Sequence, residues 1–359
     1  MIGFDVTGFI LSWAVFFSIY SILAISLNLE TGLTGMANFG KVAFYGLGAY
    51  FTGYVSIELF LRLHGLDYPI YSTDAIVALG KLSAEQPSLN LSVFLLTLVG
   101  SFLFAGAIGF LIMLPALRVG PAFFGITVLS FGEMLRIFLR HYRAVGATYG
   151  LTGIPHPLAW VGGTFHKELG FALIALSLLI FTYIYAQRIT NSPLGRLLKA
   201  IRDDETATLY LGKNVPIVKG KVLFIGSGMA GVAGCLYAYY LGSITPNAFL
   251  PAVTFEVWAM MLLGGVGNNR GAILGAGIVT FLDRSTAALN FIFPNLIIDP
   301  NFIRWMLIGM IIVVVLLFKP EGIIKEEYVW TPAWRLLEAK AEARRKAFKE
   351  LVRRLIKRR

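Results

Sequence analysis

The sequence predicts an all-α, polytopic integral membrane protein with about eight transmembrane helices and one broken or re-entrant helical hairpin. Hydrophobic residues make up 57% of the 359 residues, and charged residues make up only 14%, well below the ~25% usual in soluble domains. The mean hydropathy is +0.73. Residues 91–115 contain no charged side chain, and about 20 apolar residues are enough to cross the hydrocarbon core of a membrane. A soluble protein is therefore not expected.

Stretches with few or no charges define the expected spans. They lie at residues 8–28, 36–60, 91–116, 121–140, 169–187, 219–243 and 302–318. The first has neither Lys nor Arg before its apolar run and no small-residue cleavage site, so we expect it to remain as an uncleaved span. Residues 255–284 differ, because the sequence GGVGNNRG interrupts them and leaves two pieces too short to cross alone. We expect the hairpin at this place.

Positive charge predicts which side of the membrane each loop faces. Residues 187–221 carry seven Lys or Arg and residues 319–359 carry thirteen, out of 31 in the chain. Both segments are expected in the cytoplasm, because cytoplasmic loops are enriched in these residues. The N-terminus and the loops at 61–90 and 141–168 then face outward. The expected location is the cell membrane, plasma or inner, with a cytoplasmic C-terminus.

Two regions follow from this layout. Residues 1–320 form the membrane domain, with its main cytoplasmic loop at 188–220, and residues 321–359 form a basic amphipathic tail. After a helix start signal at Thr331 and Pro332, the tail has apolar side chains at helical spacing, namely Trp334, Leu337, Ala341, Phe348, Val352 and Leu355. It is expected to lie on the anionic lipid of the inner leaflet or, alternatively, to pack on a cytosolic partner. Nucleic-acid binding is not expected, because the topology accounts for the net charge of +11.

One motif looks like a nucleotide site but lacks a necessary group. The run from Gly35 to Lys41 has the glycine and lysine spacing of a phosphate-binding loop. Val42 stands where a Ser or Thr hydroxyl would ligate magnesium, and an apolar span follows. We therefore expect that this chain does not hydrolyse ATP itself and binds no cofactor directly.

Glycines after residue 264 have a different spacing. Gly265, Gly267 and Gly271 miss the dinucleotide-binding pattern. Gly267, Gly271 and Gly275 recur every four residues, which is typical of closely packed membrane helices. Residues 269–277 also share a small-x-x-Gly-x-Gly pattern with residues 38–49, and interrupted segments in the two halves of a transporter often border its substrate path.

The candidates for the translocation path combine these glycines with polar residues in apolar surroundings. They are Asn38, Gly46, Gly48, Thr127, Glu133, Gly265 and Gly267. Glu133 lies on an otherwise apolar helix, where an ionisable side chain is costly and thus indicates function. Arg136 lies three residues further on and can neutralise Glu133 as an i, i+3 pair, which is the structural alternative that we favour. Asp283 and Arg284 are expected only to mark the end of a span.

Residues suited to enzyme chemistry are scarce. The four His, at positions 64, 141, 156 and 166, lie in or beside predicted outer loops, and the sequence has no paired carboxylates and no HExxH motif. The single cysteine, Cys235, excludes an internal disulfide and a cysteine-based metal cage, and it is expected to be a packing residue. A metal site and a membrane-bound enzyme are therefore disfavoured.

The predicted cytoplasmic loop contains a short, well-delimited helix. It starts at Ser192 and Pro193, continues as a basic amphipathic segment, turns acidic at residues 203–205 and stops at Gly212. A short, charged, capped helix between two spans suits docking into a groove on a soluble partner.

This loop resembles the coupling segment of the LivM-type permeases of high-affinity branched-chain amino-acid ABC importers. The matching residues are Gly195, Arg196, Ala200, Ile201, Arg202, Asp204, Glu205, Ala207, Leu211, Gly212 and Asn214. Further matches occur at residues 46–50, 127–133, 150–155 and 263–267, so the resemblance covers residues 10–320.

The resemblance implies a permease subunit that docks on its ATPase through Gly195, Arg196, Ala200, Arg202, Asp204, Glu205, Ala207 and Gly212. It also implies a LivH-like second permease, two ABC ATPase subunits that hydrolyse ATP, an extracytoplasmic solute-binding protein, and leucine, isoleucine and valine as substrates. At Met36, Asn38 and Lys41 the chain departs from the Gln, Ser and His common in the family. Urea or short amides, which closely similar permeases carry, stay open as substrates. An ion-gradient-driven secondary transporter also stays open, and it should show more intramembrane carboxylates than the lone Glu133.

Overall fold

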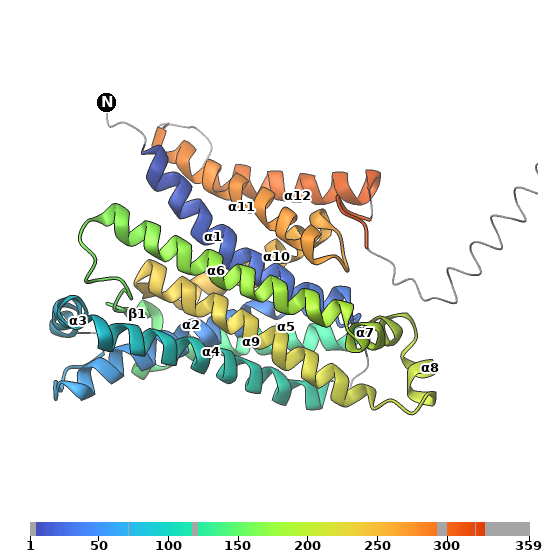
Figure 1. Ribbon diagram of the computed structural model, residues 1–359, viewed down its shortest axis with the longest axis horizontal. Helices are drawn as coiled ribbons and strands as arrows, with labels where there is room; N and C mark the ends of the chain where they lie inside the picture. Colours follow the sequence, from blue (N-terminus) through green and yellow to red (C-terminus); the bar gives the residue numbers. More distant parts are fainter. Residues whose placement is uncertain (1–4, 71, 117–120, 293–299, 320, 327–359) are drawn as a thin grey trace, which may run out of the picture. The chain divides into compact units, whose positions relative to one another are not determined.

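The computed structural model describes residues 5–70, 72–116, 121–292, 300–319 and 321–326. The predicted tail helix lies outside these residues. The main helices are α1 (Val6–Leu27), α2 (Lys41–Leu63), α3 (Thr73–Glu85), α4 (Pro87–Ala116), α5 (Pro121–His141), α6 (Thr164–Asn191), α7 (Pro193–Asp203), α8 (Glu205–Tyr210), α9 (Val215–Leu241), α10 (Pro251–Gly264), α11 (Asn269–Ile292) and α12 (Pro300–Phe318) (Figure 1). Short elements are the π-helical turn η1 (Asn28–Gly32), the 3-10 turns η3 (Arg143–Val145), η4 (Ala147–Tyr149) and η5 (Pro246–Phe249), and the strands β1 (Leu151–Thr152) and β2 (Ser243–Ile244).

The prediction of an all-α membrane protein is confirmed. Within the described residues, four segments are long and apolar enough to cross a membrane, namely Val6–Gly32, Pro87–Ile112, Thr164–Asn191 and Val215–Leu241. The other predicted spans correspond to α2, α5 and α12. Helix α2 begins at Lys41 rather than at residue 36, because the Asn38 side chain accepts a hydrogen bond from the backbone N–H of Gly40 and turns the chain just before the helix.

Two features of the loops were not predicted. Helix α3 lies in the loop expected at 61–90, and it begins where the Ser72 hydroxyl accepts a hydrogen bond from the backbone N–H of Ala75. Strands β1 and β2 pair antiparallel with Leu151 opposite Ile244, which joins the loop before α6 to the end of α9. Helix α3 and strand β1 lie at the end of the bundle opposite α7 (Figure 1).

Helix α9 is the centre of the packing. It contacts α2 and α4 along most of its length, and glycines allow the backbones to approach closely. A Cβ atom on Gly48 would lie 2.1 Å from the carbonyl oxygen of Gly231, and one on Gly234 would lie 2.1 Å from that of Tyr45. Cys235, on the same helix, is fully buried, as expected for a packing residue.

Helices α10 and α11 form the predicted interrupted hairpin. They pack side by side, and a Cβ atom on Gly275 would lie 1.9 Å from the carbonyl oxygen of Met260. The break falls at residues 265–268, where Gly265 and Gly267 have φ angles of +125° and +81° that favour glycine. The prediction that both pieces are too short to cross is wrong for α11, since its 24 residues extend about 36 Å. Gly267 likewise belongs to the turn, not to the helix packing.

Asp283 does not mark the end of a span. Helix α11 continues to Ile292, and the Asp283 side chain is buried within the bundle. Its carboxylate pairs with Arg284, at 2.9 Å, and with Arg304 of α12. The guanidinium of Arg284 also lies over the ring of Phe16, 3.8 Å from its centroid. Because both charges are satisfied by neighbours, the helix can continue through apolar surroundings.

We expect Gly48→Ala to destabilise the bundle, because the new methyl group would collide with the backbone of α9. Overpacking of this kind costs about 1–3 kcal/mol. The measurement is the thermal unfolding midpoint of the purified protein in detergent. Gly309→Ala on α12 is the matched control, since a Cβ atom there meets nothing within 4 Å. Equal midpoints for the two variants would contradict the close approach of α2 and α9.

Candidate coupling surface and translocation path

The coupling segment predicted as one helix from Ser192 to Gly212 forms two helices, α7 and α8, outside the spanning helices, because Asp204 has an extended backbone and interrupts it. The Ser192 hydroxyl accepts hydrogen bonds from the backbone N–H groups of Leu194 and Gly195. Asp204 ends α7 and caps α8, accepting a hydrogen bond of 3.0 Å from the backbone N–H of Ala207. The Ala207 amide and the Thr206 side chain lower the pKa of the Asp204 carboxyl below its ordinary value, so the cap is ionised at neutral pH.

The predicted coupling residues divide into an outward and an inward set. The outward set is exposed together with the large side chains of Tyr210 and Leu211, which are 88% and 77% exposed. We call this surface the coupling face; it consists of Arg196, Ala200, Asp204, Ala207, Tyr210, Leu211 and Gly212. Such large apolar and aromatic side chains at the surface are typical of a protein contact.

The inward set fastens α7 and α8 to the rest of the chain. Gly195 lies against the end of α6, where a Cβ atom would be 2.1 Å from the carbonyl oxygen of Thr190. Arg202 donates from Nη1 to the carbonyl oxygen of Gly32, at 2.6 Å, and pairs with Glu326 at 3.0 Å. Glu205 pairs with Lys219 of α9 at 2.6 Å. The coupling face is therefore the exposed side of α7 and α8, and the opposite side of these two helices is bonded to the rest of the chain.

The segment 321–326 joins α7 to the turn between α10 and α11. Glu326 pairs with Lys199 at 2.8 Å as well as with Arg202. In the same segment, the backbone N–H groups of residues 323 and 324 donate to the carbonyl oxygens of Leu263 and Gly264, at 3.0 and 2.9 Å. We call residues 321–326 the strap. The candidate path residues Gly265 and Gly267 lie at the turn that the strap contacts.

A buried ion pair links four helices beside this region. Glu30, in η1, pairs with Lys41 at the start of α2 at 2.9 Å, and both side chains are at most 1% exposed. Lys41 also donates to the carbonyl oxygen of Gly226 on α9, at 3.0 Å. Asn38 donates to the second oxygen of Glu30, at 2.8 Å, and accepts at its backbone carbonyl from the indole N–H of Trp258 on α10. We call Glu30, Asn38 and Lys41 the buried polar cluster.

The sequence reasoning missed Glu30. Its signal was available, because a carboxylate directly after an apolar span is costly unless it has a partner. A π-helical turn at this place adds to the signal, since such turns are frequent at functional sites. Asn38, a candidate for the path, is fully buried and has its side chain committed to Glu30 and Gly40.

The remaining path candidates do not converge on one cavity in the described part of the chain. Gly46 packs against the ring of Phe249, and Gly48 lies against α9. Thr127 donates to the carbonyl oxygen of Phe123 on its own helix. Glu133 pairs with Arg136 at 2.8 Å, so the predicted structural pairing is confirmed. A role in the path stays a prediction for these residues.

Glu133 is not the lone intramembrane carboxylate. Glu30, Glu256 of α10 and Asp283 are all buried in the bundle. Glu30 and Asp283 have Lys or Arg partners, which explains how they are tolerated. The sequence argument that counted carboxylates against a secondary transporter is therefore wrong.

Helix α5 carries Thr127 and Glu133 beside an exposed apolar surface. Five large apolar side chains of this helix are 51% to 61% exposed, namely Phe123, Ile126, Met134, Ile137 and Phe138. We call them the α5 face. In lipid such a surface contacts either acyl chains or the helices of another subunit.

Comparison with known proteins gives a consistent set of relatives. The family model described as "Branched-chain amino acid transport system / permease component" matches residues 9–316. The probable branched-chain amino acid transport permease protein LivM of Methanocaldococcus jannaschii is 31% identical over 336 residues, which are 91% of this chain and 96% of that protein. The corresponding high-affinity system proteins of Escherichia coli are LivM, 29% identical over 85% of this chain and 68% of its own length, and LivH, 26% identical over 86% and 91%. No solved structure matches significantly.

We expect Lys41→Met to destabilise the protein by about 3–5 kcal/mol, because Glu30 would be left buried without its cation. The double variant Glu30→Gln, Lys41→Met should recover part of this loss, since it removes both charges. Chemical denaturation in detergent measures both. As control, Arg62→Gln breaks a pair in which Arg62 is 76% exposed, and it should change stability by less than about 1 kcal/mol. If the stability loss of the double variant equals the sum of the losses caused by Glu30→Gln and Lys41→Met separately, the two charges do not interact.

Proposed function

The chain belongs to the family of permease components of branched-chain amino acid transport systems, and we propose that it is the permease subunit of an ATP-driven ABC importer for leucine, isoleucine and valine. The observation that supports the ATP-driven mode is the coupling face. It is exposed, carries the residues that resemble the family's coupling loop, and lies on helices that are tied inward by Arg202 and Glu205. The partners of the complex are two ABC ATPase subunits, a LivH-like second permease and an extracytoplasmic solute-binding protein.

Coupling passes from α7 to the bundle through charged contacts. A movement of α7 pulls on Gly32 through Arg202 and on the strap through Lys199 and Arg202. The strap contacts the turn at residues 265–268, whose glycines permit backbone rotation. When the ATPases close on ATP, the movement of α7 is transmitted in this way to the hairpin of α10 and α11. In this arrangement the C-terminus and the coupling face are cytoplasmic.

The translocation path lies between this chain and the second permease. The α5 face provides the apolar contact surface, and Thr127 and Glu133 supply polar groups at its border. An amino acid keeps its ammonium and carboxylate groups in the membrane, so a purely apolar passage would be costly. The path opens alternately to each side, and the solute-binding protein supplies most of the specificity.

Reconstitution into vesicles tests the proposal. The complete complex, with binding protein outside and ATP inside, should accumulate radiolabelled leucine against its gradient. Unlabelled isoleucine and valine should compete, whereas urea and acetamide should not. The chain alone should not concentrate leucine with either an ATP supply or an ion gradient. Uphill accumulation by the isolated chain would overturn the ATP-driven assignment, and competition by urea instead of valine would overturn the substrate.

Two substitutions separate docking from coupling. Ala207→Arg places a large charge on the coupling face and should reduce both ATPase co-purification and leucine uptake by about tenfold or more. Glu326→Gln removes the pairs with Lys199 and Arg202, and it should lower leucine uptake per ATP hydrolysed while the ATPase still co-purifies.

Val77→Arg is the matched control. Val77 is 68% exposed on α3, at the opposite end of the bundle, so this variant should dock and transport normally. Normal uptake by Ala207→Arg would exclude the coupling face as the ATPase contact. Unchanged uptake per ATP by Glu326→Gln would exclude the strap as the route of coupling.

A further inference from the structure

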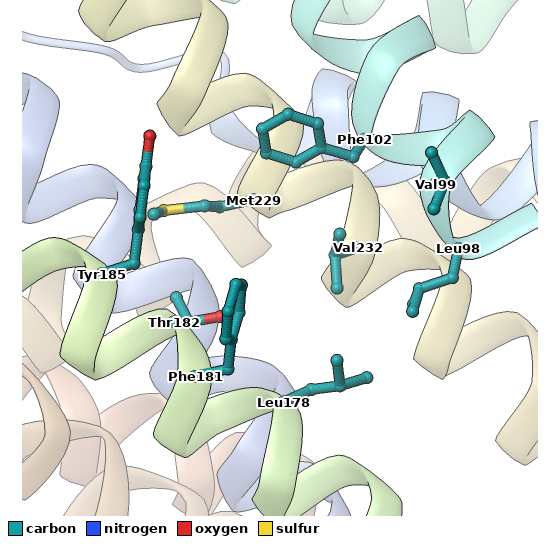
Figure 2. A pocket seen from close by; sticks show the side chains of 9 residues that line it. All are labelled: Leu98, Val99, Phe102, Leu178, Phe181, Thr182, Tyr185, Met229 and Val232. Carbon is teal, nitrogen blue, oxygen red and sulfur yellow. The ribbon is translucent and has the colours of Figure 1, made fainter. Parts of the chain in front are cut away.

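An apolar groove of about 350 Å³ lies between α4 and α6, with α9 as its floor (Figure 2). Figure 2 shows side chains of α6 on one side, those of α4 on the other, and Met229 and Val232 of α9 between them. The lining residues are Leu98, Val99, Phe102, Leu178, Phe181, Thr182, Tyr185, Met229 and Val232.

The groove exists because α4 and α6 flank α9 without a substantial contact with each other in the described part of the chain. Helix α4 is held close to α9 by small residues, since a Cβ atom on Gly228 would lie 2.7 Å from the ring of Phe102. Helix α6 packs mainly on α1. The space between them stays open to the membrane, and no helix of the described chain fills it.

The occupant must be apolar and must arrive from the lipid. Phe181 and Val99, at the two edges, are 69% and 58% exposed, so the groove opens on the surface that contacts the membrane. A lining that is almost wholly apolar cannot hold ordered water, because water needs two to four polar partners. An acyl chain of a phospholipid meets both conditions.

A cation lies at the end of the groove nearest α7. Arg188 follows Phe181 by seven residues, which is two helical turns, so it lies on the same stripe of α6. Its side chain is exposed, and no residue of the described chain forms an ion pair with it. A second hollow of about 360 Å³ lies on the other side of Arg188, on the face of α6 that contacts α11, and is lined also by Tyr183, Ile184, Gln187, Asn191 and Ser192. Within the described residues, the phosphate site in the groove therefore consists of Arg188 alone, and an exposed guanidinium without an ion-pair partner is well suited to bind a phosphate group.

The distance from groove to cation matches one leaflet of a membrane. Ten residues separate Leu178 from Arg188, which corresponds to about 15 Å along the helix axis. Half of a hydrocarbon core of about 30 Å is the same length. A lipid with its head group at Arg188 would thus have its acyl chain beside Leu178 near the midplane.

From this geometry we infer that the groove binds an anionic phospholipid, with an acyl chain on Met229 and Val232 and its head-group phosphate at Arg188. Basic sites between membrane helices select anionic head groups over zwitterionic ones. The inference does not depend on the substrate or on ATP coupling, since it needs only that the chain lies in a membrane.

Native mass spectrometry of the full chain in detergent tests the site, with dioleoyl phosphatidylglycerol and dioleoyl phosphatidylcholine as probes. The wild-type chain should prefer phosphatidylglycerol by about fivefold. Arg188→Gln should lower this preference, with the basic tail unchanged, while the chain still binds both lipids. Arg62→Gln, which removes an exposed cation at the opposite end of the bundle, should leave the preference unchanged.

A second pair of variants tests the apolar part. Val232→Trp fills the floor of the groove and should weaken binding of both lipids, whereas Leu173→Trp, on an exposed position of α6 outside the groove, should not. Equal thermal midpoints confirm that both variants are folded, and if Val232→Trp unfolds, Val232→Phe takes its place. Equal affinity of the wild-type chain for the two lipids would overturn the inference. Unchanged lipid binding by Val232→Trp would also overturn the inference. The same holds if this variant keeps its lipid binding but no longer co-purifies with the second permease subunit, because the groove would then be a contact between subunits.

Discussion

The pairing of Glu30 with Lys41 is the contact on which the arrangement of the bundle depends. A single unpaired charge inside a membrane protein is costly, so each of these side chains requires the other. The pair fixes the end of α1 against the start of α2, and Lys41 extends the same constraint to α9 through Gly226. Asn38 connects α10 to the same cluster, because its backbone carbonyl accepts a hydrogen bond from the indole N–H of Trp258. Four helices thus meet at one buried polar cluster.

The contacts of α7 begin only two residues from this cluster. Glu30 and Gly32 belong to the same π-helical turn, and Gly32 is the residue that Arg202 contacts. The rigid part of the bundle and the part that faces the proposed ATPase therefore share one short turn. The strap forms a second connection, from α7 to the glycine turn of the hairpin. Two separate routes lead from the coupling face into the membrane domain.

Local features were the ones that the sequence could predict. Apolar runs located the spans to within a few residues, and the sequence GGVGNNRG located the break between α10 and α11. The caps of the coupling helix were also readable, because Ser192 and Gly212 act on their immediate neighbours. The pairing of Glu133 with Arg136 is of the same kind, since the partners lie one turn apart.

Contacts between distant parts of the chain were not predictable in the same way. Lys41 meets Gly226, and Asp283 meets Arg304, only after the helices have packed, and nothing in the local pattern indicates these partners. Asp283 was read as the end of a span for this reason. Glu256 was missed because its helix is short and its surroundings come from other helices. In the candidate coupling segment, the helix start at Ser192 could be predicted, whereas the inward contacts of Arg202 and Glu205 could not, and a coupling role for the exposed residues stays a prediction.

The salt bridge between Asp283 and Arg304 limits how the helices can move. If α11 slid along α12, the two charges would separate, and Asp283, whose side chain is buried, would lose its partner in apolar surroundings. Arg284, held over Phe16, ties the same point to α1. These three helices are therefore expected to travel together during transport as one rigid panel. Relative movement of helices is then expected at interfaces formed by uncharged contacts, where sliding separates no ion pair.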